Sequence, residues 1–497
     1  MTVTRRPRVL AAAVARPRSA PGPVLLLALV SVLYGVAQLV IVSPWMGIGW
    51  DETVYASQYA GHAPPAVFSA PRARGVPLLV APVVAVTDSV FALRLYLTLL
   101  SSLALFGAYY VWLRVRADRS VPLAALLFGA CWLSLFYGNE AMPNLYVALG
   151  AVAATGFFAL LGRSRGALVG LGASLALVSL LRPSDSLFLA VPLGVAALVA
   201  ADRRRLLALV AMAAGLAVGW GQWLVEALTR FGGVAERLRA AEEANLTGLT
   251  VSVLEHAQAL DGPSLCRFGV RCGEVSPIAL VWWLAIPATA VLGVWVAWRA
   301  HRPGPVVLAA VTGLAVALPY LFYVGYAAPR FLMPAYALLA LPVAVAATGL
   351  GRDGLGRDGF GRDGRWRGAV AGVMAAGVLA HLALQGAYAY KMAGNTLETR
   401  QAIGRATEEL RRLGVRPPCL VYGQSGVQIG YLLGCESQGV IQGFASRTPT
   451  RVRQLAEGGH RLVMVYTDLP LPRYARDWDE VVLTGRWKAR FAPAGGR

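Results

Sequence analysis

Apolar blocks of roughly 17–25 residues recur along this chain from residue 24 to residue 391. A helix of about 20 apolar residues crosses the ~30 Å hydrocarbon core of a bilayer, so each block is long enough to span it. Of the 497 residues, 57% are hydrophobic and 14% are charged. A soluble domain has about 45–50% and about 25%, respectively. The sequence therefore predicts an α-helical polytopic membrane protein.

Arginines indicate which ends of the spans face the cytoplasm. Five of them precede the first block, so residues 1–23 are predicted to stay inside, and the block itself is a retained span because it lacks a clear cleavage site. Arginines recur in every second short loop, at residues 114–119, 163–165, 203–205, 299–302 and 352–367. About eleven spans are expected within a membrane domain of residues 24–391, near residues 24–42, 90–113, 121–137, 145–161, 167–181, 185–201, 206–228, 278–298, 305–324, 331–350 and 369–390.

This alternation places two long loops, 43–89 and 229–277, and the tail 392–497 outside the cytoplasm. Val76–Val86 is apolar but short, which favours a re-entrant or interfacial helix. In the tail, "PCLVYG" and "RLVMVYT" have the pattern of buried strands, with the helical segment "VQIGYLLG" between them. The tail is therefore predicted to be a small extracytoplasmic α/β domain.

Two features that suggest a nucleotide or nucleic acid are better explained by the membrane topology. Residues 351–368 repeat "GRDG" and satisfy G-x-G-x-x-G at Gly354, Gly356 and Gly359, but that fingerprint is meaningful only between a strand and a helix. We interpret the segment as a cytoplasmic linker. The net charge of +20 follows the loops expected inside, so no nucleic acid is expected as a partner.

The cysteines agree with this topology. Cys266 pairs naturally with Cys272 in "CRFGVRC", and Cys419 with Cys435, all in segments expected outside, where disulfides persist. The alternative is four unrelated thiols. Cys131 falls within a span.

Candidate functional residues gather at the outer ends of the spans. "IGWDETVYASQ" places Asp51 and Glu52 directly after a segment with two tryptophans at the end of a span. Because the two acids are consecutive, their side chains are expected to point in different directions. Further charges follow in the expected outer loops and turns, at Arg72, Arg74, Glu140, Arg182, Asp185 and Arg330. Charges near the membrane are expensive and usually paired or functional, although each alone could be an ordinary solvated loop charge. The five histidines form no H-E-x-x-H motif, and "YGQSG" lacks the G-x-S-x-G spacing, so neither a zinc protease nor a serine hydrolase is indicated.

The opening "W-D-E-x-x-Y" of the first outer loop, an acid in the next outer turn and "PRFLMPAYALLALP" before a late span together resemble the GT-C superfamily. These membrane glycosyltransferases use polyprenyl-phosphate sugars and include the protein O-mannosyltransferases and the lipid A aminoarabinose transferases. The resemblance covers roughly residues 24–350. It implies an inverting, hexosyltransferase-type transfer of sugar from a lipid phosphate to a hydroxyl of a protein, lipid or glycan at the outer face of the membrane.

The resemblance also implies roles for individual residues. Asp51 would be the general base, and its pKa is expected to move toward working pH in a partly dry cleft. Glu52 would support it or help to hold a divalent metal ion or the acceptor. Glu140 matches the second acid, and Arg330 would neutralise the donor phosphate. Substrate binding is also expected of Arg72, Arg74, Arg182 and Asp185.

Two other functions remain open at this point. A transporter or flippase would show charges near the bilayer midplane and internally repeated halves. Here the charges lie at the ends of spans and no convincing repeat is present. The other alternative is a non-catalytic assembly protein of the cell envelope that binds through its tail.

Overall fold

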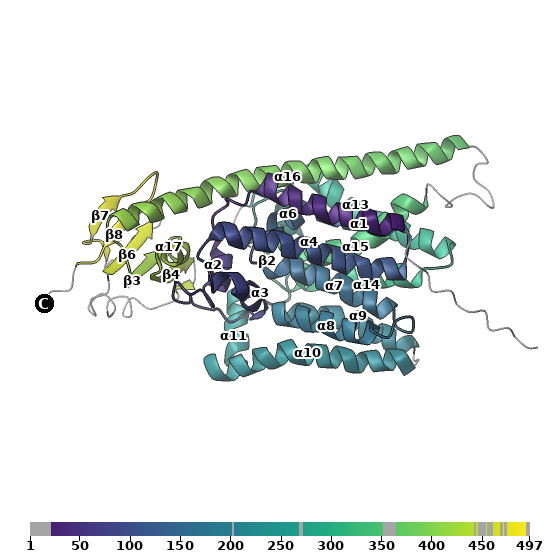
Figure 1. Cartoon of the computed structure of the whole chain (residues 1–497), viewed down its shortest axis with the longest axis horizontal. Helices are drawn as coiled ribbons and strands as arrows, with labels where there is room; N and C mark the ends of the chain where they lie inside the picture. The colour runs from purple at the N-terminus through teal and green to yellow at the C-terminus, as the bar shows by residue number, and fades with distance from the viewer. Residues whose placement is uncertain are drawn as a thin grey trace, which may run out of the picture.

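Apolar helices form one bundle, and a small α/β domain caps one end of it (Figure 1). The computed structural model describes residues 21–200, 203–267, 272–350, 364–441, 444–445, 454, 461–467, 471 and 475–493. The expected cytoplasmic N-terminal segment, apart from its last residues, and residues 351–363 of the GRDG linker lie outside the described residues. The end of the bundle that meets the α/β domain is called the domain end below.

The first half of the described chain forms the helices α1 to α10. Their bounds are α1 Pro21–Ala37, which continues as the π-helical turn η1 Gln38–Val42, α2 Trp50–Ala56, α3 Gly75–Val84, α4 Val90–Val115, α5 Ser120–Gly129, α6 Trp132–Gly138, α7 Pro143–Ala159, α8 Ala167–Leu181, α9 Pro183–Ala200 and α10 Arg203–Arg230.

The second half completes the bundle and leads into the tail. Its elements are α11 Val234–Asn245, α12 Val253–Gln258, the short paired strands β1 Cys266–Arg267 and β2 Tyr326–Ala327, α13 Pro277–Arg299, α14 Gly304–Phe322, the 3-10 turn η2 Pro329–Leu332, α15 Met333–Gly349 and α16 Gly364–Arg412.

The described helices match the expected spans. Eight of them are long and apolar enough to cross a membrane, and α5 with α6, which are bent by 71°, are long enough for a ninth when the pair is taken as one broken span. The two remaining expected spans correspond to α7 and α8, with 17 and 15 residues. The chain is a multi-pass membrane protein. The short apolar segment of the first loop forms the ten-residue helix α3 rather than a span.

Helix α7 lies at the centre of the bundle and connects it to the turn that carries Glu140. Nearly all of its residues are buried, and it is apolar on every side, as expected of a helix surrounded by other helices. Pro143 occupies its first turn, where the missing N–H costs nothing. The turn between α6 and α7 therefore begins and ends on rigid, buried helices.

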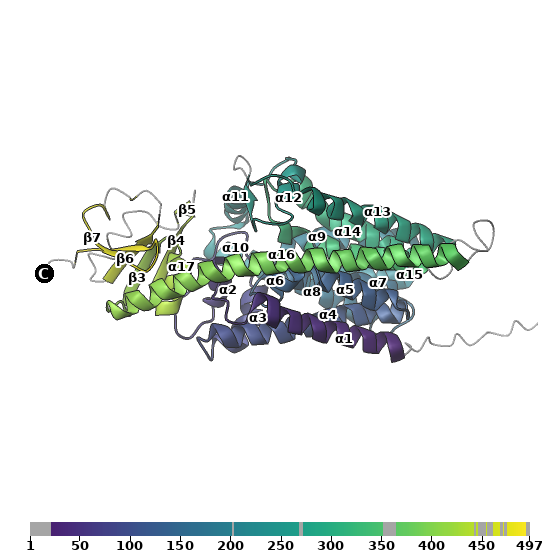
Figure 2. The same cartoon turned by 90° about the horizontal axis from the view of Figure 1, so that it is seen from above.

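Helix α16 is longer than the expected last span at residues 369–390. It continues for 49 residues without a break, so the tail expected from residue 392 begins as the outer end of this helix, which runs to Arg412. Residues 364–412 contain no proline, which would break a helix, and the glycines beyond the bundle are single ones that a helix tolerates. Figure 2 shows it running along the bundle and into the α/β domain.

The α/β domain is built on a six-stranded sheet of order β5-β4-β3-β6-β8-β7. Its central strands β4, β3 and β6 are parallel, and the outer pairings are antiparallel. One face, with Val421 and Val463, packs on α16 and α17, while the other buries Leu420 and Leu462. The bounds are β3 Cys419–Gly423, α17 Gly426–Leu433, β4 Glu436–Ile441, β5 Phe444–Ala445, β6 Arg461–Tyr466, β7 Asp479–Val482 and β8 Lys488–Phe491.

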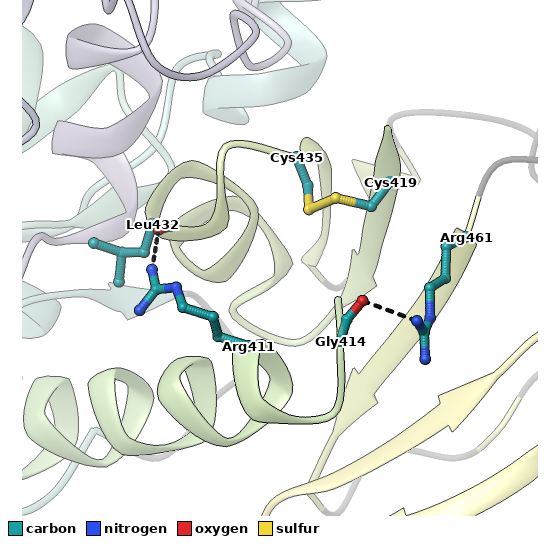
Figure 3. The surroundings of a disulfide bond; sticks show 6 residues. All are labelled: Arg411, Gly414, Cys419, Leu432, Cys435 and Arg461. Carbon is teal, nitrogen blue, oxygen red and sulfur yellow. Dashed lines mark hydrogen bonds between the residues drawn. A yellow bond between two sulfur atoms is a disulfide. The ribbon is translucent and has the colours of Figure 1, made fainter. Parts of the chain in front are cut away.

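Both expected cysteine pairs are bonded, and the buried Cys131 is free. Cys419 at the start of β3 is joined to Cys435, which follows α17 (Figure 3). Nearby, Arg411 of α16 donates to the carbonyl of Leu432 at 2.8 Å, which fixes α17 against the long helix (Figure 3). The disulfide therefore joins the start of β3 to the end of α17, and the hydrogen bond from Arg411 holds this unit against α16.

Helices α8 and α10 approach so closely that Gly219 has no room for a side chain. A Cβ added there would lie 2.3 Å from the carbonyl carbon and Oγ of Ser179, whereas one at Gly221 meets nothing within 4 Å. We expect Gly219→Ala to cost about 1–3 kcal/mol through overpacking. The melting temperature in nanodiscs should fall for this variant and not for Gly221→Ala, the matched control on the same helix. Equal melting temperatures would contradict the contact.

Candidate functional site

The W-D-E motif forms the first turn of α2 at the domain end of the bundle. The N–H of Gly49 donates to Oε2 of Glu52 at 2.8 Å, and Oγ1 of Thr53 donates to the Gly49 carbonyl at 2.7 Å. A helix N-terminus favours carboxylates because its free N–H groups carry partial positive charge. Consecutive helical residues point about 100° apart, so Asp51 and Glu52 face different arginines.

Asp51 is held between two arginines from distant parts of the chain. Its Oδ1 accepts from Nη2 of Arg72 at 2.5 Å, and its Oδ2 from Nη2 of Arg330 at 3.4 Å. The Arg72 guanidinium also lies 5.4 Å from the ring centroid of Trp50 and 4.8 Å from that of Tyr55. The Asp51 side chain is 34% exposed, so this carboxylate is accessible while its partners are largely buried.

The pKa of Asp51 lies below its ordinary value. Burial raises it, but the charges of Arg72 and Arg330, the hydrogen bond from Arg72 and the charge of Arg182 together lower it by more. The expectation that this pKa moves toward neutral pH is therefore wrong for this arrangement. The reason is that the arginines stabilise the charged form more than partial burial destabilises it.

Glu52 is engaged within the fold through both carboxylate oxygens. Arg94 binds it as a fork at 2.5 and 2.8 Å, and the Ala141 N–H donates to Oε1 at 2.8 Å. Arg400 adds a contact to Oε2 at 3.2 Å. The side chain is 1% exposed. Glu52 therefore ties the start of α2 to α4, α16 and the turn before α7, and it offers no free surface to a substrate.

Glu140 shares Arg400 with Glu52. Nη2 of Arg400 donates to Glu140 Oε1 at 2.6 Å, and Nη1 donates to the Gly47 carbonyl at 3.0 Å. Burial raises the pKa of Glu140 to about 7, although the charge of Arg400 lowers it, and the charge of Glu52 adds to the rise. Glu140 thus gains and loses its proton near neutral pH, unlike its two acidic neighbours.

Arg182, Asp185 and Arg330 form the other side of the site. Nε of Arg182 lies 3.7 Å from Asp185 Oδ1, and the Tyr320 hydroxyl donates to the same oxygen. The guanidiniums of Arg182 and Arg330 lie 4.8 and 5.5 Å from the ring centroid of Phe331. The charges of three expected arginines, Arg72, Arg182 and Arg330, thus act on one expected carboxylate, that of Asp51.

Arg74 lies outside this group, and its expected role in substrate binding stays a prediction. It pairs with Glu226 at 2.5 Å and donates to Gln58 at 2.8 Å. Glu226 also pairs with the buried Arg237 at 3.1 Å, and Arg237 donates to the carbonyl of Arg72 at 2.9 Å. This neighbouring cluster fixes the backbone of the loop that carries Arg72.

Sequence reasoning missed Arg94, Glu226 and Arg400. The first two had a signal, because each is a charge inside a stretch expected to span the membrane, and such charges are usually paired. Arg400 had none. It lies in a helical segment with many other charges, and only the unbroken course of α16 brings it to Glu52 and Glu140.

These acids do not fit a divalent metal site. Each carboxylate is paired with arginine, and no group of three or more His, Cys, Asp or Glu side chains that could share an ion occurs among the described residues. A cation held here would have to displace the arginines first. The chemistry proposed below therefore includes no step through a metal.

A cleft of about 500 Å³ opens beside the site. Its walls come from the start of α2, the loop 261–264, α16 from Lys391 to Ile403, and Gln428 of α17. The carbonyl of Ser264 in this wall accepts from Nη1 of Arg330 at 3.1 Å. The cleft thus adjoins the arginines around Asp51 and is closed on one side by the α/β domain.

Comparison with solved structures identifies the fold of this chain. No family model and no curated protein sequence matches the chain. Among solved structures, ArnT of Cupriavidus metallidurans bound to undecaprenyl phosphate matches with a TM-score of 0.60 at 16% identity, covering 96% of this chain and 100% of ArnT. The chain has the GT-C fold.

Other GT-C structures match over similar parts of this chain. The oligosaccharyltransferase of Archaeoglobus fulgidus, tethered with an acceptor peptide, matches with a TM-score of 0.55 at 14% identity, covering 90% of this chain and 68% of the other. The arabinofuranosyltransferase AftD from mycobacteria gives 0.54 at 13% identity, covering 95% and 40%. At these identities the comparison establishes the fold, and the function must be argued from the site.

Glu140 should make stability depend on pH near neutrality. With a pKa of about 7 in the fold and about 4.3 in the unfolded chain, its contribution is fully present below about pH 4.3 and is lost as pH rises through about 7. The melting temperature of the wild type, minus that of Glu140→Gln, should therefore fall between pH 5 and pH 8.

The exposed Glu398 on the same helix as Arg400 provides the control, because Glu398→Gln removes a carboxylate away from the buried arginines. A difference between wild type and Glu140→Gln that stays constant over this pH range would show that the pKa of Glu140 is not raised.

Proposed function

We propose that this protein is a glycosyltransferase that moves a sugar from a polyprenyl-phosphate donor to an acceptor hydroxyl at the extracytoplasmic face of the membrane. The observation that carries the proposal is an accessible carboxylate, Asp51, held by Arg72 and Arg330 at one end of a GT-C bundle. An acid for the nucleophile and cations for a leaving phosphate are the two groups that this reaction needs.

The arginines would bind the donor phosphate. Arg72, Arg330 and the neighbouring Arg182 present guanidiniums whose planar geometry suits phosphate oxygens and whose charge persists at any working pH. ArnT was solved with undecaprenyl phosphate, and the Archaeoglobus oligosaccharyltransferase with dolichol-phosphate, which supports a lipid phosphate as the donor class. The isoprenoid chain would lie in the bilayer alongside the spans.

Donor binding would also activate Asp51. In the free protein, Arg72 and Arg330 keep its pKa low, which makes it a weak base. A phosphate that takes over hydrogen bonds from these arginines removes part of that stabilisation and brings a negative charge nearby. Both changes raise the pKa of the carboxylate. Asp51 would therefore become an effective base only when the donor is in place.

In the transfer step, the acceptor oxygen attacks the anomeric carbon and its proton passes to Asp51. The bond between that carbon and the phosphate oxygen breaks, and polyprenyl phosphate leaves with the electron pair, neutralised by the arginines. Attack opposite to the leaving group inverts the anomeric configuration. Glu52 positions Asp51 by fixing the first turn of α2, and it does not react itself.

The topology supports an extracytoplasmic site. The arginine-rich loops that follow α4, α7 and α13 lie at the end of the bundle opposite the α/β domain, and positive loops stay in the cytoplasm. Both disulfides lie at the domain end, in keeping with an oxidising compartment. The N-terminus would therefore be cytoplasmic and the α/β domain outside.

Asp51→Asn tests the base. We expect the variant to fold, because an amide still accepts from Arg72, and to lose sugar transfer by a factor of about 10² or more. Transfer is measured with membranes and labelled polyprenyl-phosphate sugars, with the product identified. Asp88→Asn, an exposed acid of the same loop, is the control. Full transfer by Asp51→Asn would remove the assigned base, and flux through proteoliposomes without a glycosylated product would favour a transporter.

Arg330→Gln tests the phosphate contact. We expect KM for the lipid-phosphate donor to rise about tenfold or more, because a charge-assisted bond to phosphate is lost. Affinity for undecaprenyl phosphate, measured by calorimetry, should weaken in parallel. Arg302→Gln, at the opposite end of the bundle, should change neither value. Unchanged donor affinity in Arg330→Gln would place the phosphate elsewhere.

A further inference from the structure

The cleft beside Asp51 contains charges that are already neutralised. Lys391 lies 3.3 Å from Asp261, and Arg400 pairs with Glu52 and Glu140. Each charged side chain that lines the cleft thus has its partner in the protein. The lining therefore offers an incoming phosphate or carboxylate no cation without a partner, which favours a neutral occupant.

The remaining polar lining consists of amides and hydroxyls. Asn395, Thr396 and Thr399 come from successive turns of α16, and Gln428 faces them from α17. Amides and hydroxyls both donate and accept, which suits a ligand whose own groups do the same. Trp50 adds an aromatic ring at the edge nearest Asp51. This combination matches the hydroxyls and the apolar ring face of a saccharide.

Gln428 gives an independent indication of a ligand. The residue is only 6% exposed, and its Oε1 is buried and accepts no hydrogen bond from any described residue. A buried acceptor without a partner costs roughly 1–3 kcal/mol, a cost that a donor supplied by a ligand would relieve. Gln428 also lies in the first turns of a helix that follows a parallel strand, at the edge of the sheet where ligands commonly bind.

The cleft is in the right place for the acceptor. Trp50 immediately precedes Asp51, and its ring lies against Arg72. Ser264 binds Arg330, and Arg400 contacts Glu140. A molecule in the cleft therefore reaches the residues that surround the base. The volume of about 500 Å³ falls within the usual range for small-molecule sites, about 300–1,000 Å³.

We infer that this cleft binds the acceptor and that the acceptor is a neutral glycan, held between α16 and the α/β domain. The inference rests on the proposed function and narrows it, because it selects a saccharide over a protein or a charged lipid. It also gives the α/β domain a role: Gln428 makes the domain one wall of the acceptor site.

The test measures glycan binding without donor. Full-length protein in nanodiscs, which avoid the sugar headgroups of maltoside detergents, is applied to immobilised hexose and pentose tetrasaccharides and to a Ser/Thr-rich peptide. We expect the wild type to bind at least one tetrasaccharide and not the peptide. Gln428→Leu and Asn395→Leu should each weaken that binding about tenfold, the effect of losing one or two hydrogen bonds. Gln401→Leu, outside the cleft on the same helix, should leave it unchanged.

Asn395 is exposed, so its variant keeps the test valid if Gln428→Leu fails to fold. Binding to the peptide alone, binding to no tetrasaccharide, or binding unaffected by both cleft variants would each overturn the inference. Because no donor is present, these outcomes are separate from the proposed function. Glycan binding without any sugar transfer would overturn only the latter.

Discussion

The structure around the site depends on one buried interaction, the carboxylate of Glu52 between Arg94 and Arg400. Arg94 also donates to the carbonyls of Met46, Gly47 and Asn139, so a single guanidinium joins α4, the first loop and the turn after α6. Removing one member of such a group leaves a buried charge unpaired, at about 3–5 kcal/mol. Any conformation that separates Glu52 from Arg94 or Arg400 would incur this cost, so the network holds α2 in one position.

That constraint has a direct consequence for Asp51. With Glu52 turned inward, the preceding residue must point elsewhere around α2, and there it meets Arg72 and Arg330. Two adjacent acids thus have different environments: one is sealed within a network, and the other stays accessible. Under the proposed mechanism, the low pKa of Asp51 would link the base to binding of the donor phosphate, because the same arginines would serve both groups.

The fold and part of the site could be predicted from the sequence. Hydropathy marked each membrane helix because every apolar block has to satisfy the same bilayer thickness. The W-D-E motif, Arg72, Arg182 and Arg330 could be identified because the predicted topology brings all of these charges to one face of the membrane. Arg400 could not be found in this way. Its sequence neighbourhood is that of any charged helix, and its importance follows from an unbroken helix that carries it more than a full turn beyond the expected span.

The sequence by itself determined which segments are apolar enough to cross the membrane and which end holds the charges, because hydropathy and loop charge are local properties. It favoured the two cysteine pairs, which the structure contains. Only the tertiary structure decided which acid is free and which arginine belongs to which cluster. Arg72 and Arg74 are two residues apart and serve different carboxylates, Asp51 and Glu226. Pairing of charges is set by distances across packed helices, and no spacing along the chain encodes those distances.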